Sequence, residues 1–281
     1  MPDERQTKND KRDAARELAR ITREKQKRQE RLRRWLIPTG VTVVVLAIVA
    51  IVVLVVTTSA PPPQSADGPK NMVSDGILLT GSGGKMVPTK TGAVQASSTP
   101  TPHDLPSDGV AHIVTYVDFS CPACQSFEAT NADTIEQMVE QGKATLEIHP
   151  IAILDTHYTT NYSTRASNVA ACVANFAPES FYDVMKAMYV GQAKEGTAGL
   201  ANSQMVSIVH SAGLRNGDVD KCINGVTFKS WVTSATTRAT TGPLPNTSVA
   251  NVNSTPTVLV NGQQYDGSIA FTDFVQQTLA G

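Results

Sequence analysis

Apolar residues follow different spacings along this chain, and each spacing predicts a different element. The first is a run from Leu36 to Val56, 21 residues without one charged side chain. At about 1.5 Å per residue, a helix of this length spans a hydrocarbon core of about 30 Å. The run therefore predicts a single transmembrane helix, with Trp35 at the membrane interface. A cleaved signal peptide is the alternative, but its apolar region is normally only about 7 to 15 residues long.

Further along the chain, a nearly continuous apolar run is followed by a helical pattern. Ala111 to Phe119 predicts a central strand that is covered on both faces. Cys121 to about Gln141 carries its large apolar side chains on one face, which predicts a helix. Ala144 to Leu154 predicts a second strand. A strand, a helix and a strand in this order form a right-handed βαβ unit with a parallel sheet.

The remaining patterns predict a helical insert and two hairpins. Residues 163 to about 240 contain Ala-rich segments with helical spacing, and a Gly-rich turn between short apolar runs predicts a hairpin from Gly76 to Pro88. Asn261 and Gly262 predict a hairpin turn after a β-branched strand. The expected helices are Ala166–Phe176, Ser180–Val190, Ser203–Ala212, Val219–Thr237 and Ile269–Leu279. The fold class is therefore α/β with a helical insertion, preceded by a single transmembrane helix.

Joints rich in Pro, Ser and Gly divide the chain between these elements. The joint after the apolar run is expected to be a semi-extended spacer. We expect a basic tail at 1–34, a transmembrane helix at 35–56, a linker at 57–75, an N-terminal hairpin and joint at 76–110, and a globular domain at 111–281.

The net charge of −1 conceals a strong asymmetry. Residues 1–34 contain 13 Lys/Arg and 7 Asp/Glu, whereas the rest of the chain contains 11 and 18. Basic residues directly before a membrane helix place the N-terminus in the cytoplasm and the acidic globular domain outside it. Because this topological role accounts for the basic tail, we expect no nucleic-acid partner.

Two cysteines separated by two residues, Cys121 and Cys124, stand where the predicted central strand turns into a helix. Unpaired N–H groups and the helix dipole at that point favour a thiolate, so Cys121 is the candidate nucleophile. Cys124 lies one turn further on, within reach of a disulfide. The pair can therefore cycle between dithiol and disulfide.

Zinc, haem and a purely structural bridge are the alternatives for this pair. Zinc usually requires four ligands, and the other two cysteines, Cys172 and Cys222, are isolated and 50 positions apart. Haem attachment requires His directly after the second cysteine, where this chain has Gln125. A structural bridge does not require a strand before it and a helix after it. We therefore expect redox chemistry without a metal or another cofactor.

The sequence resembles the DsbA-like branch of the thioredoxin superfamily in three features taken together. These are a strand followed by Phe-x-Cys-Pro-x-Cys, a helical insert, and a Thr-Pro-strand-Asn-Gly hairpin. The resemblance covers roughly residues 76–281 and implies a thioredoxin-like fold. It implies that Cys121 is the attacking cysteine and Cys124 the resolving one. It also implies that Pro256 is a cis-proline facing the disulfide, preceded by Thr255.

Two departures from the family pattern affect the expected chemistry. Ala123 stands between the cysteines and carries no charge or donor, so we expect the thiolate to depend on the N–H groups of the helix terminus alone. Thr115 stands where relatives often bury an acid that handles the proton of the inner thiol. Asp118 and Glu128 are the nearest carboxylates and are candidates for proton handling. For each, a surface or solvated acid is the alternative.

These patterns predict an extracytoplasmic, membrane-anchored thiol:disulfide oxidoreductase that introduces disulfides into secreted or surface proteins. Its partners are cysteine-containing clients and, by the resemblance, a membrane thiol oxidase of the DsbB-like or vitamin-K-epoxide-reductase-like type. A disulfide isomerase or reductase is the first alternative. A non-enzymatic, membrane-tethered thioredoxin-fold binding module is the second.

Cys172 and Cys222 are predicted to form a structural disulfide within the insert, because thiols oxidise outside the cytoplasm and these two remain after the redox pair is assigned. Two buried free thiols are the alternative.

Overall fold

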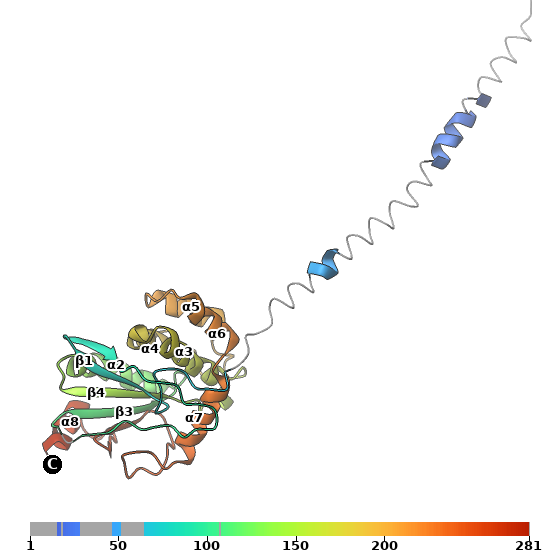
Figure 1. The fold of residues 1–281 in the computed structure, drawn as a ribbon. Helices are drawn as coiled ribbons and strands as arrows, with labels where there is room; N and C mark the ends of the chain where they lie inside the picture. Colours follow the sequence, from blue (N-terminus) through green and yellow to red (C-terminus); the bar gives the residue numbers. More distant parts are fainter. Residues whose placement is uncertain (1–15, 18, 29–46, 52–64, 107, 281) are drawn as a thin grey trace, which may run out of the picture. The chain divides into compact units, whose positions relative to one another are not determined.

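The computed structural model describes residues 16–17, 19–28, 47–51, 65–106 and 108–280 (Figure 1). The chain divides into two units, Met1–Ala60 and Pro61–Gly281. Within these described stretches, no helix is both long and apolar enough to cross a membrane. Most of the predicted transmembrane segment, Leu36 to Val56, lies outside the described residues. In the first unit the described residues are helical and exposed.

A six-stranded sheet forms the centre of the second unit, in the order β2-β1-β4-β3-β5-β6. Strands β3 and β4 are parallel and are joined by α2, whereas the other neighbouring strands are antiparallel. Six of the seven residues of β3 are buried, because the strand is central and both of its faces are covered. The strands are β1 (Ile77–Ser82), β2 (Lys85–Pro88), β3 (Ala111–Val117), β4 (Ala144–Pro150), β5 (Thr257–Val260) and β6 (Gln263–Gln264).

The pairing of β3 with β5 brings together two segments that are far apart in the sequence. The strands run antiparallel, and Tyr116 near the end of β3 pairs with Thr257 at the start of β5. The residues just before β5 therefore lie beside the residues just after β3. Those two loops contain the predicted Thr-Pro and Cys-x-x-Cys motifs.

Five helices form the insert and gather beside the sheet (Figure 1). Helix α3 is almost completely buried, since its alanines and serines allow neighbouring helices to approach closely. The single segment predicted at Val219–Thr237 is wrong, because the chain breaks into two helices at Val226, whose φ is 48°. The helices are α2 (Pro122–Glu140), α3 (Tyr162–Phe176), α4 (Phe181–Val190), α5 (Asn202–Ser211), α6 (Gly217–Gly225), α7 (Lys229–Thr241) and α8 (Phe271–Ala280).

A disulfide between Cys172 and Cys222 joins α3 to α6 across 50 residues. Asn168 lies beside it and accepts a hydrogen bond from the Phe228 N–H at 2.9 Å. Closing a loop of this length stabilises the folded state by up to about 4 kcal/mol in the chain-entropy model. The bridge therefore fixes the insert, and it leaves Cys121 and Cys124 as the free cysteines.

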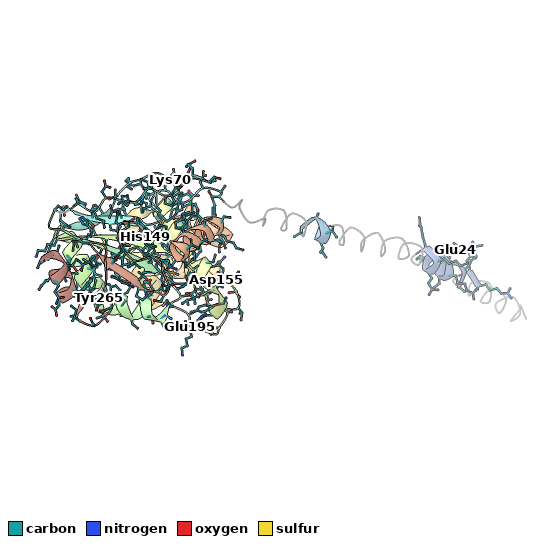
Figure 2. The ribbon with its side chains drawn as sticks, turned by 90° about the horizontal axis from the view of Figure 1, so that it is seen from below. Glu24, Lys70, His149, Asp155, Glu195 and Tyr265 are labelled. Carbon is teal, nitrogen blue, oxygen red and sulfur yellow. A yellow bond between two sulfur atoms is a disulfide. The ribbon has the colours of Figure 1, made fainter. Side chains whose placement is uncertain are left out.

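Residues 65–75 pack into the second unit, so the linker predicted at 57–75 is wrong for this part. Met72 is fully buried, and the Asn71 side chain donates to the Ala174 carbonyl at 2.8 Å. His149 lies inside the unit, whereas Lys70 lies at its surface (Figure 2). The pattern did not reveal this docking, because one apolar side chain among polar anchors has no periodicity.

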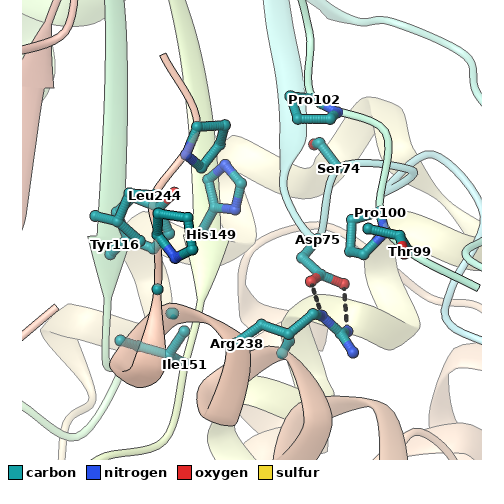
Figure 3. Close-up of a pocket in the computed structure, with 15 residues that line it drawn as sticks. Ser74, Asp75, Thr99, Pro100, Pro102, Tyr116, His149, Ile151, Arg238 and Leu244 are labelled. Carbon is teal, nitrogen blue, oxygen red and sulfur yellow. Dashed lines mark hydrogen bonds and ion pairs between the residues drawn. The ribbon is translucent and has the colours of Figure 1, made fainter. Parts of the chain in front are cut away.

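Asp75 is the main polar anchor of this segment. Its carboxylate accepts two hydrogen bonds from Arg238, at 2.6 and 2.8 Å, and one from the Trp231 indole at 3.0 Å. A pocket of about 390 Å³ lies beside this ion pair (Figure 3). Asp75 thereby ties the segment before β1 to α7 of the insert.

The substitution Asp75→Asn is expected to lower the free energy of unfolding by about 2 kcal/mol, because it leaves the partly buried Arg238 without its counter-ion. Urea unfolding measures the loss. The matched control is Glu179→Gln, which removes the exposed pair with Lys90 and is expected to cost less than about 1 kcal/mol. Equal effects of the two substitutions would contradict the assignment of 65–75 to the folded unit.

Candidate active site

Cys121 is the residue that precedes the first turn of α2. Its backbone is extended, with φ −85° and ψ 120°, and Pro122 follows at the first helical position, where its missing N–H costs little. The residue is 6% exposed, and its sulfur lies 3.2 Å from the carbonyl oxygen of Thr255. Cys124, one turn further on, is fully buried. The outer sulfur is thus the one that a second molecule can reach.

The two thiols have opposite pKa shifts. The pKa of Cys121 is lowered to about 6, chiefly by a hydrogen bond from the Cys124 thiol and further by the N–H groups of Cys124 and Ala123, against the rise that burial causes. Burial raises the pKa of Cys124 well above its usual value. The expectation that helix-terminus N–H groups alone support the thiolate is therefore wrong, because the inner thiol contributes most.

The Thr-Pro motif lies at this site. The peptide bond between Thr255 and Pro256 is cis, and the Thr255 carbonyl contacts the Cys121 sulfur. The hydroxyl of Thr255 is buried and has no hydrogen-bond partner among the described residues. The same holds for the hydroxyl of Thr115, on β3.

Asp118 is fully buried, so its interpretation as a surface acid is wrong. Burial raises its pKa, and hydrogen bonds from Ser163, Ser120 and Leu154 partly offset that rise. The strand predicted to continue to Leu154 ends at Pro150 because the following residues turn toward this carboxylate. The donors to Asp118 are Ser120 N, Ser120 Oγ, Ile153 N, Leu154 N and Ser163 Oγ.

Glu128 is also buried, at 8% exposed, so its interpretation as a solvated helix residue is wrong as well. Its carboxyl makes no hydrogen bond or ion pair with any residue that the structure describes. Burial raises its pKa to about 7, and the positive charge of Lys186 opposes that rise. Asp118 thus accepts several hydrogen bonds, whereas Glu128 accepts none from the residues that the structure describes.

Two residues that the sequence patterns did not single out hold the loop before Cys121. The Gln192 side-chain amide donates to the carbonyls of Phe119 and Cys121, at 2.9 and 3.1 Å. The Tyr158 hydroxyl donates to the Ser120 carbonyl at 2.7 Å. They come from the end of α4 and from the segment after β4, and isolated polar residues of this kind carry no recognisable spacing.

The part of the chain that is described contains no cluster of three His, Cys, Asp or Glu side chains able to hold a metal ion.

The sheet with its βαβ unit, the helical insert and the dithiol at a helix N-terminus together define a redox protein of the thioredoxin class. The family model described as Thioredoxin matches residues 107–278, and the chain belongs to this family. The predicted thioredoxin-like α/β fold with a helical insertion is therefore confirmed.

Solved structures similar to this chain include thiol-disulfide oxidoreductases. DsbA from Mycobacterium tuberculosis, in its reduced form, is 27% identical with a TM-score of 0.54, over 74% of this chain and 93% of that one. DsbG from the same organism, a disulfide bond oxidoreductase, is 25% identical with a TM-score of 0.50, over 74% and 95%. BdbD from Bacillus subtilis shares the fold, at 15% identity and a TM-score of 0.52, over 78% and 100%. No protein with a curated description matches the chain.

The pKa of Cys121 can be checked by its alkylation with iodoacetamide in the reduced protein. The rate is expected to rise between pH 5 and 7 with a midpoint of about 6, since only the thiolate reacts. In Cys124→Ala the midpoint is expected to move to higher pH, because the largest stabilising hydrogen bond is lost. An unchanged midpoint in this variant would contradict the assigned cause.

Proposed function

We propose that this chain is an extracytoplasmic, membrane-anchored thiol:disulfide oxidoreductase that introduces disulfides into secreted or surface proteins through its Cys-Pro-Ala-Cys pair. The observation that carries the proposal is the pairing of Cys121, with a pKa lowered to about 6, with the fully buried Cys124. Cys121 retains a small exposed fraction of 6% and its thiolate is a good leaving group, whereas Cys124 is fully enclosed. A merely structural bridge requires neither property.

The reaction cycle starts from the Cys121–Cys124 disulfide. A client thiolate attacks the Cys121 sulfur, the bond between the two cysteines breaks, and the Cys124 thiolate leaves and takes up a proton, since its pKa is raised. A second client thiolate then attacks the client sulfur of this mixed disulfide. The Cys121 thiolate is expelled, the client gains a disulfide, and the protein is left as a dithiol with two more electrons.

The low pKa of Cys121 favours this direction. At pH 7 a thiol with a pKa of about 6 is mostly ionised, which stabilises the reduced protein by on the order of 1 kcal/mol. Stabilising the reduced form makes the pair a better oxidant. A membrane thiol oxidase of the DsbB-like or vitamin-K-epoxide-reductase-like type would then restore the disulfide.

Disulfide isomerase or reductase is the second candidate function. Thr255 before the proline and Ala123 between the cysteines favour it by resemblance. The oxidase is favoured by the described residues between 65 and β3, which contain the β1–β2 hairpin and extended segments packed on the domain. Isomerases of this group use a separate dimerisation domain at this place.

For proton handling we propose Glu128 ahead of Asp118. Its carboxyl lies one helical turn beyond Cys124, has no partner among the described residues, and has a pKa near 7. Asp118 instead serves to hold the loop, because donors from three segments occupy its carboxylate.

The extracytoplasmic location is supported by two observations. The apolar run of 21 residues follows a basic tail, and a disulfide closes the insert. Stable disulfides are rare in the cytoplasm of most cells.

The function is tested by mixing the oxidised protein with a reduced, unfolded client that has several cysteines. We expect client thiols to disappear at the rate at which the protein is reduced, with no activity in Cys121→Ser or in Cys124→Ser, since neither variant can form the disulfide. If Cys121 of Cys124→Ser is first activated as a mixed disulfide with thionitrobenzoate, a client thiolate should expel thionitrobenzoate and leave a trapped mixed disulfide between client and Cys121. The resting redox state in cells is expected to be oxidised. A reduced resting state, with activity on scrambled clients alone, would instead establish the isomerase.

The anchor is tested by alkaline extraction of cell membranes. The full chain is expected to remain in the membrane pellet, and a chain that begins at Ser65 is expected to be released. Protease added to intact cells stripped of their wall should digest the globular unit. Recovery of the full chain in the supernatant would contradict the anchor.

A further inference from the structure

A hollow of about 410 Å³ lies beside the redox site, between α2 and α4. Its volume is in the range of about 300 to 1,000 Å³ that is typical of ligand sites. The hollow begins at Gln125, whose N–H donates to the Cys121 carbonyl at 3.1 Å. We call it the α2–α4 hollow. It is lined by Gln125, Ser126, Glu128, Ala129, Thr130, Ala132, Asp133, Lys186, Tyr189 and Val190.

The carboxyl of Glu128 is the unusual feature of this hollow. Glu128 is 8% exposed and lines the cavity, and its carboxyl makes no hydrogen bond or ion pair within the described part of the chain. A carboxyl with so little exposed surface loses much of its hydration, and its oxygens reach solvent only where they meet the hollow. The missing partner would approach through the hollow.

The charges around the hollow favour a cation. Asp133 is exposed in the wall of the hollow. The negative field is also seen at the Tyr182 hydroxyl, whose pKa is raised first by burial and then by four nearby carboxylates: Glu128, Glu136, Asp133 and Asp183. Lys186 is the one cation among the residues that line the hollow. Its ammonium lies 2.7 Å from Glu136 and 3.6 Å from Asp183, so its charge is already offset.

The hollow also offers apolar surface to an aliphatic stem. Val190, at the end of α4, is 88% exposed, and Ala129 lines the opposite helix. Arginine and lysine side chains place their methylene stems on such surfaces while their charged heads reach a carboxylate. Arginine suits a carboxylate best, since its planar guanidinium can donate two parallel hydrogen bonds.

Helical spacing places this site at a defined distance from the reacting sulfur. Glu128 is seven residues after Cys121, so the two lie on the same face of α2 and about 10 Å apart along its axis. An extended client advances about 3.3 Å per residue. A residue about three positions from the client cysteine therefore reaches the hollow while that cysteine reacts at Cys121.

We propose that the α2–α4 hollow binds an arginine or lysine side chain of the client, about three residues from its reacting cysteine, and that Glu128 is its counter-ion. The inference rests on the proposed function and adds a substrate class to it. Clients with a basic residue near a cysteine are then oxidised in preference to neutral ones.

The pKa of Glu128 gives the preference a pH dependence. The groups that face it are Lys186, Tyr182 and Tyr189 from α4 and Asp133 from α2. A bound cation favours the carboxylate form, so the preference should be weak at pH 6 and stronger at pH 8, on either side of the pKa of about 7.

The test uses two dithiol peptides that are identical except at the third residue from one cysteine, where one has arginine and the other has the neutral isostere citrulline. The rate at which each peptide reduces the oxidised full-length protein is measured by stopped flow. At pH 8 and low salt we expect the arginine peptide to react about fivefold to tenfold faster, with a smaller ratio at higher salt. The ratio cancels any uniform change in rate.

In Glu128→Gln the ratio is expected to fall to about one, and in Glu140→Gln, an acid of α2 outside the hollow, it should persist. Equal rates for the two peptides in the unmodified protein, or a ratio that survives Glu128→Gln, would overturn the inference. If Glu128→Gln does not fold, the unmodified protein still provides the test: a rate ratio that stays constant from pH 6 to pH 8 would overturn the inference. Failure to oxidise either peptide or dithiothreitol would instead reject the proposed function.

Discussion

The buried carboxylate of Asp118 is the constraint on which the redox site depends. It accepts hydrogen bonds from the loop before Cys121, from the residues after β4 and from Ser163 of α3. A buried carboxylate is tolerated only when donors replace its lost hydration, so these three segments must meet at one point. The place where β3 ends and α2 begins is thereby fixed relative to the helical insert.

That fixed junction allows the two thiols to differ. The same burial that raises the pKa of Cys124 keeps its proton available as a hydrogen bond to the Cys121 thiolate. Gln192 of the insert and Tyr158, from the segment after β4, donate to carbonyls of the loop before Cys121 and so hold that loop in place. Reactivity therefore depends on the insert, although the insert contributes no sulfur to the reaction.

The insert is in turn held by connections to the rest of the unit. The Cys172–Cys222 disulfide joins two of its helices, and Asp75 connects the segment before β1 to α7. The face of α2 that carries the dithiol continues into the α2–α4 hollow, where Glu128 has no hydrogen-bond partner among the described residues. Hydrogen-bonded polar groups such as Asp118 and Asp75 hold the frame, whereas Glu128 is available beside the place where a client would bind.

The sequence alone predicted most of the elements and singled out Cys121 and Cys124 as the candidate redox pair. The spacing of Cys121 and Cys124 at the start of a helix is a local feature, and so is the Asn-Gly turn at Asn261. Both can therefore be predicted from short stretches of the sequence. Tertiary structure decided what the spacing does not encode: the docking of residues 65–75, the break at Val226, the donors from Gln192 and Tyr158, and the burial of Asp118 and Glu128. These features join residues tens of positions apart, and their burial and pKa values depend on which surfaces pack together. Only the folded chain specifies that packing.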